Sequence, residues 1–392
     1  MGELLLLSTF FCLGALIIVV WLHSPSWLEY QTPFVSPPVA GPLVSVIVPA
    51  RNEERNIRRC VESILAQDYP NLQIVVLDDR STDSTPAILS ELSCGDARLT
   101  VVRGGDLPAG WAGKPYALYQ AAALAHGEWL LFLDADTFLH PNAVSAALAA
   151  AQQCGADLYT VMTAQILGSF WERTVMPLIF TALSVGFSPR RVNAPERRDA
   201  IANGQFILIR RAVYEAIGGH EAVKGEIVED KAISEKVKWD GFRLVVADGT
   251  NIAQTRMYTD LPAMWEGWTK NIYLGLSDRS GLLLLGAFGA FLALMAALVL
   301  PVWPLSGVLW YFKGGGWMAI LVTFEALLVW AFVLLARMRV NRQMQVPIAY
   351  AFLTPLGAGV FAAMMLTSAW KVLSGRGVMW KGRRYGQRAK SS

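Results

Sequence analysis

Long apolar runs at both ends of this 392-residue chain restrict it to folds that combine membrane-length helices with one polar domain. Apolar runs occupy residues 4–22, 281–305, 317–336 and 346–370. Each is long enough, at ~1.5 Å per residue, to cross a hydrocarbon core of ~30 Å. The composition agrees, because 54% hydrophobic and 17% charged residues are too apolar for an ordinary soluble domain. We therefore expect a retained N-terminal anchor at 1–24 and transmembrane or re-entrant helices at 281–370.

Basic residues indicate which side of the membrane the ends of these helices face. Arg337, Arg339 and Arg342 follow the third run, and a basic tail occupies residues 371–392. Positive residues favour the cytoplasmic side, yet these two groups flank a single apolar run. Either this run is re-entrant or kinked near Pro355, or the rule fails for the tail; we favour the first. The expectation is an integral protein of a bacterial cell membrane whose polar domain faces the cytoplasm.

Strand and helix patterns alternate in the polar part of the chain. A Pro-rich linker at 25–42 precedes apolar strands expected at 43–49, 72–77, 99–102 and 128–133. Helical patterns fill the gaps at 52–67, 83–92, 114–125 and 141–153. This alternation predicts an α/β fold with a mixed, mostly parallel sheet over residues 43–256. Residues 257–280 are rich in Trp and Tyr and are expected to form an amphipathic segment at the membrane interface.

Two acidic motifs end strands of this predicted sheet. Asp78-Asp79 follows one apolar strand, and Asp134-Ala135-Asp136 follows another. Open α/β sheets bind ligands at the carboxyl ends of their strands. Carboxylates two residues apart can share Mg²⁺ or Mn²⁺, which prefer oxygen ligands and keep room for phosphate. The alternatives are a plain turn after a strand, or acids that serve the dipole of the next helix.

Four further segments have side chains suited to a nucleotide or a reacting hydroxyl. Pro49-Ala50-Arg51-Asn52-Glu53-Glu54 closes the first strand, and its side chains can bond a base. Lys114 ends a Gly-rich loop and can reach a diphosphate, while Gly204 permits close approach of a ligand. Glu229-Asp230 opens a helix expected at 229–239, from which Asp230 can act as general base. Each of these four has an alternative explanation. The first segment can be a capped helix start and Lys114 a solvated lysine. Gly204 can belong to a plain turn, and Glu229-Asp230 can serve the helix dipole.

Taken in order, these motifs resemble the family 2 glycosyltransferases with a GT-A fold. The matching residues run from Val46-Ile47-Val48-Pro49-Ala50-Arg51-Asn52-Glu53-Glu54 to Glu229-Asp230 and cover about half the chain. The resemblance extends to membrane-bound members that glycosylate lipids, the carotenoid, hopanoid-associated and ceramide glucosyltransferase-like enzymes. It rests there on the anchor, the loop at 110–114, the segment at 265–271 and the tail motif at 375–383.

The resemblance implies a role for each matching residue. Asn52, Glu54 and Asp79 would hold the nucleotide, Asp136 a Mg²⁺ or Mn²⁺ ion on the diphosphate, and Asp230 would be the base beside Glu229. Pro49, Ala50, Arg51, Asp78, Lys114, Asp134 and Gly204 would complete the donor site. Trp265, Trp268 and Lys270 would lie on the acceptor side. One departure is the lack of a Gln-x-x-Arg-Trp motif after the base, where residues 265–271 stand instead.

The function that follows is inverting transfer of one sugar from a UDP-sugar to a membrane lipid. Carotenoid, hopanoid, ceramide and diacylglycerol acceptors all remain open, as does the oligomeric state. The rival activities are a processive polysaccharide synthase and a non-catalytic, nucleotide-binding membrane scaffold. The net charge of +3 is too small to argue for nucleic acid. The absence of a Gly-x-Gly-x-x-Gly motif after the first strand argues against a dinucleotide oxidoreductase.

Overall fold

The computed structural model describes residues 41–392 except 187, 278–280, 375–376, 381–382 and 386–392. The expected anchor at 1–24 and nearly all of the linker at 25–42 lie outside the described residues. The chain divides into two compact units. The sheet unit contains Ser26–Ile166 and Phe187–Met257, and the helical unit contains Leu167–Gly186 and Tyr258–Ser392. Residues 167–186, which interrupt the expected polar domain, thus belong to the helical unit.

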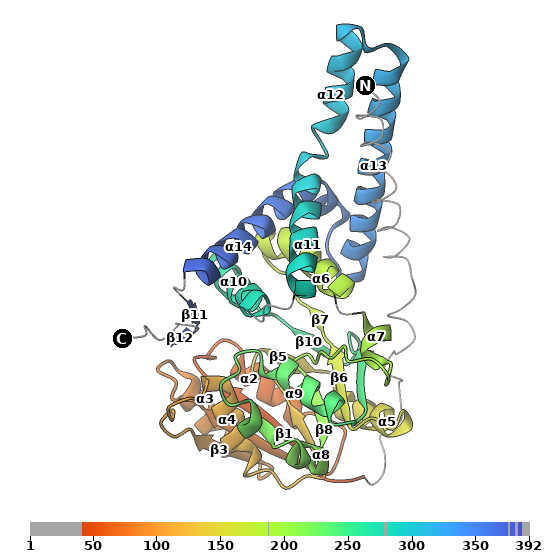
Figure 1. Cartoon of the computed structure of the whole chain (residues 1–392). Helices are drawn as coiled ribbons and strands as arrows, with labels where there is room; N and C mark the ends of the chain where they lie inside the picture. The colour runs from red at the N-terminus through yellow and green to blue at the C-terminus, as the bar shows by residue number, and fades with distance from the viewer. Residues whose placement is uncertain (1–40, 187, 278–280, 375–376, 381–382, 386–392) are drawn as a thin grey trace, which may run out of the picture. The chain divides into compact units, whose positions relative to one another are not determined.

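A seven-stranded sheet forms the centre of the sheet unit (Figure 1), in the order β3-β2-β1-β4-β8-β6-β9. Its strands are β1 (Val44–Ala50), β2 (Leu72–Asp78), β3 (Leu99–Arg103), β4 (Trp129–Phe132), β6 (Leu158–Met162), β8 (Ile207–Arg210) and β9 (Leu244–Asp248). Strands β3, β2, β1 and β4 are parallel, and so are β6 and β9. Strand β8 alone runs antiparallel to both of its neighbours, β4 and β6. The predicted mixed, mostly parallel sheet is confirmed.

Helices cover both faces of this sheet, which explains why its strands read as continuous apolar runs rather than alternating ones. Val46 and Val48 of β1 pack on one face, while Ile47 between them packs on the other. The helices of the unit are α2 (Ile57–Leu65), α3 (Thr85–Ser93), α4 (Gly113–Ala122), α5 (Ala143–Gln153), α7 (Pro189–Asn193), α8 (Arg211–Ala216) and α9 (Glu229–Trp239), with a 3-10 helix at Gly219–Val223. Helix α9 has the bounds that its sequence pattern predicts.

A second, three-stranded sheet lies beside the ends of the larger one. It has the order β5-β10-β7 and consists of β5 (Thr137–Leu139), β7 (Ala164–Gln165) and β10 (Ala253–Thr255). Strand β10 runs antiparallel to β5 and parallel to β7. Because β5 begins directly after Asp136, this small sheet fixes the chain on the far side of the second acidic motif.

The helical unit is built from α6 (Phe170–Gly186), α10 (Leu261–Ser277), α11 (Gly281–Val299), α12 (Trp303–Trp310), α13 (Gly316–Gln343) and α14 (Thr354–Ser374). A 3-10 helix at Ile348–Leu353 precedes α14, and the strands β11 (Val378–Trp380) and β12 (Arg383–Tyr385) pair in the tail. Two segments, Trp303–Gln343 and Ile348–Ser374, are long and apolar enough to cross a membrane by length and composition. The first contains a reversal at Tyr311–Gly315, where Gly314 has a φ of 91°, so that α12 and α13 pack against each other.

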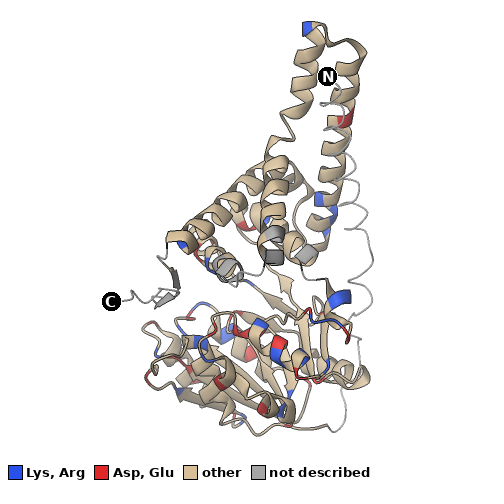
Figure 2. Cartoon of the chain, in the orientation of Figure 1, with Lys and Arg blue, Asp and Glu red and all other residues tan. Residues whose placement is uncertain are grey.

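Charged residues are sparse along α11, α12 and α13 but frequent over the sheet unit (Figure 2). Large apolar side chains on these three helices are exposed, among them Phe288, Leu309 and Phe324. Exposed large apolar side chains gathered on a few helices are typical of a site that meets a membrane or a partner. Helix α14 begins at Thr354, so Pro355 lies in its first turn, where proline is favourable. The expected break near Pro355 is therefore a helix start after the 3-10 segment.

Candidate active site

The carboxyl ends of β1, β2 and β4 meet at one edge of the large sheet. Ala50 of β1 pairs with Asp78 of β2, and Ile47 pairs with Phe132 of β4. The backbone N–H of Asp79 donates to the carbonyl of Ala50 over 2.7 Å. This register carries both strand-end acidic motifs to the same edge, as their positions predict.

Reciprocal hydrogen bonds join the loops that follow β1 and β2. Asn52 has a φ of 53°, and its Oδ1 accepts from the N–H of Thr82 over 2.9 Å. The N–H of Asn52 donates to Ser81 Oγ over 2.9 Å, and the N–H of Ser84 donates to Glu54 Oε2 over 3.1 Å. Two side chains predicted to bind the nucleotide therefore also order the loops that would surround it. Neither Ser81 nor Thr82 caps α3, since that position belongs to Ser84.

Two guanidinium groups flank the carboxylate of Asp79, which is 7% exposed. Arg51 Nη1 donates to the Asp79 carbonyl over 2.7 Å and lies 3.8 Å from its Oδ2. Arg80 has a φ of 55°; its Nε lies 3.8 Å from Asp79 Oδ1 and its Nη1 lies 2.6 Å from Asp106 Oδ1. The neighbouring Asp78 accepts from the N–H of Ser81 over 3.1 Å, which gives it a role within the loop.

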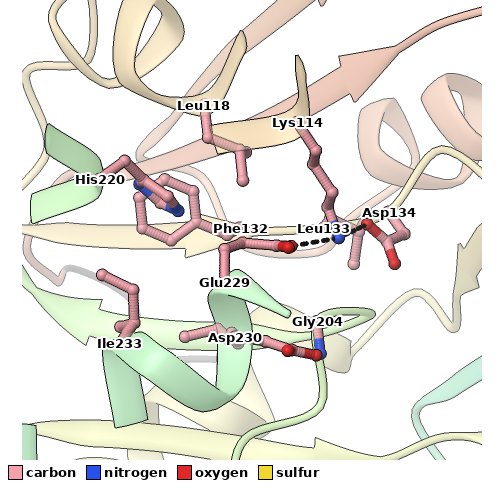
Figure 3. Close-up of a pocket in the computed structure, with 11 residues that line it drawn as sticks. Lys114, Leu118, Phe132, Leu133, Asp134, Gly204, His220, Glu229, Asp230 and Ile233 are labelled. Carbon is pink, nitrogen blue, oxygen red and sulfur yellow. Dashed lines mark hydrogen bonds and ion pairs between the residues drawn. The ribbon is translucent and has the colours of Figure 1, made fainter. Parts of the chain in front are cut away.

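Lys114 is the central cation of the candidate site (Figure 3). Its Nζ lies 2.7 Å from Asp134 Oδ1 and 2.6 Å from Glu229 Oε1. It thus bridges the acidic motif after β4 and the acidic pair that opens α9, which are almost a hundred residues apart in sequence. Burial alone would lower the pKa of Lys114, but the carboxylates of Asp134, Glu229 and Asp230 outweigh it and hold the pKa well above its ordinary value. Lys114 is therefore not a freely solvated lysine, which was the alternative left open by its sequence context.

Asp230 is held by backbone donors at the start of α9. The N–H of Gly204 donates to its Oδ2 over 3.0 Å and the N–H of Lys231 to its Oδ1 over 2.7 Å. Burial, and then the charge of Glu229, raise the pKa of Asp230 to about 6, although Lys114 and both hydrogen bonds act in the opposite direction. A carboxyl group with a pKa near the working pH is suited to general base chemistry.

Gly204 makes space for the acidic pair rather than for a ligand directly. A Cβ atom there would lie 2.9 Å from Asp230 Oδ2 and 3.2 Å from Lys114 Nζ. Its φ is not positive, so the demand for glycine comes from this crowding and not from backbone strain. The groups that crowd Gly204 are the protein's own charged side chains, and the close approach of a ligand there stays a prediction.

A small pocket opens between Lys114, Asp134, Glu229 and Asp230 (Figure 3). His220 also lines it, a residue that the sequence patterns did not single out. Its Nδ1 lies 2.8 Å from the hydroxyl of Tyr214, and its ring packs edge-on against Phe132. Burial and the charge of Lys114 lower the pKa of His220 to about 3, so the ring is neutral and forms part of the pocket wall.

The metal predicted at Asp136 would have few protein ligands. No group of three or more His, Cys, Asp or Glu side chains that could hold a metal ion occurs within the described part of the chain. Mg²⁺ is usually held by one or two carboxylates together with water and substrate phosphates, so a complete protein cage is not required. Asp136 fits that pattern: it follows β4 at the sheet edge, and Lys114 engages its neighbour Asp134.

The residues predicted for the acceptor side all lie on α10 in the helical unit. Trp268 is 6% exposed; its Nε1 donates to Met176 Sδ over 3.3 Å, and its ring contacts Phe180 and Tyr258. Trp265 and Lys270 are half-buried on the same helix. Trp268 is thus a packing residue inside the helical unit.

Comparison with known proteins agrees with this architecture. Residues 45–218 match the model of glycosyl transferase family 2, so this part of the chain is similar to that family. The 4,4'-diaponeurosporenoate glycosyltransferases of Staphylococcus aureus strains MRSA252 and USA300 are 31% identical over 236 residues, which cover 59% of this chain and 61% of each relative. A mannosyltransferase from Pyrobaculum calidifontis, solved with GDP-Man and Mn²⁺, matches 95% of this chain and 97% of its own with a TM-score of 0.53 and 19% identity. That likeness confirms the GT-A fold.

Proposed function

We propose that this protein is an inverting glycosyltransferase that moves one sugar from a UDP-sugar to a hydroxyl or carboxyl oxygen of a membrane lipid. The observation that supports it best is the joining of two separate acidic motifs, Asp134 and Glu229-Asp230, around Lys114 at the ligand-binding edge of a sheet that matches the family 2 model. The name of the Staphylococcus aureus relatives supports a polyene carboxylic acid as one acceptor class. The apolar helices α11, α12 and α13 support a bilayer location.

The reaction would be a single displacement at the anomeric carbon. The acceptor oxygen forms a bond to that carbon while the bond to the diphosphate breaks, and UDP leaves with the electron pair. Asp230 would take the proton of an acceptor hydroxyl on its carboxylate, which the N–H groups of Gly204 and Lys231 hold in place. Lys114 would neutralise the surrounding carboxylates and can turn towards the diphosphate. A divalent cation at Asp136 would supply charge stabilisation to the departing diphosphate.

An acceptor carboxylate would change the need for the base. A carboxylic acid is already ionised at neutral pH and can attack without losing a proton to Asp230. A hydroxyl group keeps its proton and depends on the base. Comparison of the two acceptor types with one enzyme therefore tests the role of Asp230 in addition to the substrate class.

The direct test is transfer by the full chain in membranes supplied with UDP-glucose and either 4,4'-diaponeurosporenoate or a long-chain alcohol. A product one hexose heavier than its lipid supports the proposal, whereas a ladder of masses indicates the processive synthase. With the alcohol, Asp230→Asn should abolish transfer and leave UDP binding intact. Asp240→Asn, an exposed acid at the other end of α9, is the matched control. Equal loss of transfer and UDP binding in Asp230→Asn would refute the assignment of the base. If wild type released no UDP with any donor, the non-catalytic scaffold would be favoured.

A further inference from the structure

A row of buried hydroxyl and amide groups connects the two acidic sides of the site within the sheet unit. Thr137, Thr163, Gln205 and Thr255 are between 0% and 6% exposed. Thr137 follows the predicted metal ligand Asp136, and Gln205 follows Gly204, whose N–H binds Asp230. Thr137 and Thr255 come from the small sheet, and Thr163 is the single residue between β6 and β7, so the three are far apart in sequence.

The direction of the hydrogen bonds in this row follows from counting protons. Thr255 Oγ1 donates to Thr163 Oγ1 over 3.4 Å, and Thr163 Oγ1 donates to Gln205 Oε1. A hydroxyl group has one proton, so Thr255 must accept from Thr137, whose Oγ1 lies 3.1 Å away. All the donors therefore point from Thr137 towards Gln205.

The side-chain amide of Gln205 is fixed in one orientation by its neighbours. Asn203 cannot be flipped, because its Nδ2 donates to the carbonyl of Val161 over 2.9 Å and its Oδ1 accepts from the N–H of Gln205 over 3.3 Å. The same Nδ2 lies 3.4 Å from Gln205 Oε1, and Gln165 Nε2 lies 3.3 Å from it. Three donors, counting Thr163, thus converge on one atom, which must be the oxygen.

This arrangement turns the Nε2 group of Gln205 away from the buried row. Within the described residues it donates to no partner, and it is not among the buried polar atoms that lack both solvent and a partner. The ordering of a buried amide with both N–H bonds unused inside the protein is costly unless they meet water or a ligand. The Nε2 group therefore keeps hydrogen-bond donor capacity that no described residue uses, and it belongs to the residue after Gly204, whose N–H holds Asp230.

We propose that Gln205 is a specificity-determining residue that donates from Nε2 to an oxygen of the acceptor, and that Thr137, Thr255 and Thr163 are positioning residues that fix this amide. The inference rests on the proposed function. The acceptor is the better occupant because Gln205 leads into β8, across β4 from the loops of β1 and β2 that would hold the nucleotide. It also follows Gly204, whose N–H holds the base, and the substrate of the base is the acceptor oxygen.

The kinetic test uses the full chain in membranes with UDP-glucose and the acceptor that wild type uses. Gln205→Met should raise the KM for the acceptor about threefold to tenfold, as expected for one lost neutral hydrogen bond. Thr163→Val should also raise it, by less, and Thr163→Ser should restore it because the hydroxyl returns. The KM for UDP-glucose should stay unchanged in all three. Gln152→Met, an exposed glutamine on α5, is the control for the substitution itself.

The outcomes separate this inference from the proposed function. A wild-type acceptor KM in Gln205→Met overturns the assignment, as does a Thr163→Ser variant that behaves like Thr163→Val. If wild type transfers no sugar, the proposed function fails. The orientation of the Gln205 amide is then tested separately, by NMR of the full chain with ¹⁵N-labelled glutamine side chains. The Gln205 amide signals should shift or split in Thr163→Val but not in Thr163→Ser. Unchanged signals in both would refute the role of the threonine row.

Discussion

Replacement of Lys114 by methionine should move the acid limb of the pH–rate profile upwards, because Lys114 favours the ionised form of Asp230. A Cβ on Gly204 would lie 3.2 Å from Lys114 Nζ and 2.9 Å from Asp230 Oδ2, so the two charged atoms are at most about 6 Å apart. At an effective dielectric constant of about 20, this separation corresponds to roughly 3 kcal/mol, or about two pKa units. The Lys114 side chain is 36% exposed, and solvent screening reduces the expected shift to about one unit.

The assay is UDP release from UDP-glucose with a long-chain alcohol, an acceptor that does not titrate in the range used. In wild type, log(kcat/KM) should rise with pH up to about 6, where Asp230 loses its proton, and then level off. In Lys114→Met the limb should lie near pH 7, whatever the loss in absolute rate. Lys224→Met removes the same charge from an exposed position and should leave the limb in place. A limb that moves by less than about 0.3 units in Lys114→Met would refute the charge coupling.

The remaining predictions concern stability, crowding and the metal. Asp230→Asn should raise the free energy of unfolding by about 1–2 kcal/mol at pH 8, by roughly half of that at pH 5 and by little at pH 3, since a carboxyl whose pKa rises on folding from 3.8 to about 6 contributes stability that is lost as pH increases through this range; thermal unfolding at the three pH values measures it. Gly204→Ala should lower transfer at least about tenfold with UDP binding retained, because the new Cβ crowds the acidic pair. Asp136→Ala should weaken Mn²⁺-dependent UDP binding at least about tenfold in calorimetry, and an equal affinity with and without Mn²⁺ in wild type would count against that site. Gly357→Ala should lower the melting temperature by several degrees, because its Cβ would lie 2.5 Å from a backbone oxygen of α6, whereas Gly359→Ala meets only an ordinary contact at 3.4 Å.

The parts of the fold that sequence could predict are those set by local pattern. Continuous apolar runs predict the parallel strands β1, β2 and β4, because such strands are buried on both faces. Their ends locate Asp79 and Asp136 without further information, since parallel strands end at one edge. The bounds of α9 were predictable because Glu229-Asp230 opens a segment with helical periodicity and basic residues near its end.

The rest depends on contacts between residues far apart in the chain. The small sheet has strands of two or three residues, and its pairing of Thr137 with Thr255 has no local periodicity to reveal it. Nothing in the loop before α4 shows that Lys114 meets Asp134 and Glu229. Trp268 is an aromatic residue in an amphipathic pattern, and sequence alone does not separate a buried packing residue from one that contacts an acceptor.

The charge balance at the site indicates why Lys114 would matter before the donor binds. Asp134, Glu229 and Asp230 place three carboxylates around one ammonium group, and burial, followed by the charge of Glu229, raises the pKa of Asp230. Without an internal cation, these acids would take up protons or separate. An incoming nucleotide diphosphate with a divalent ion, as proposed, would bring both a competing anion for Lys114 and a new cation for the acids. If Lys114 exchanged the acids for the diphosphate, the divalent ion would keep the acids neutralised. The N–H groups of Gly204 and Lys231 would hold the base throughout. Donor binding would then need no rearrangement of the backbone around Asp230.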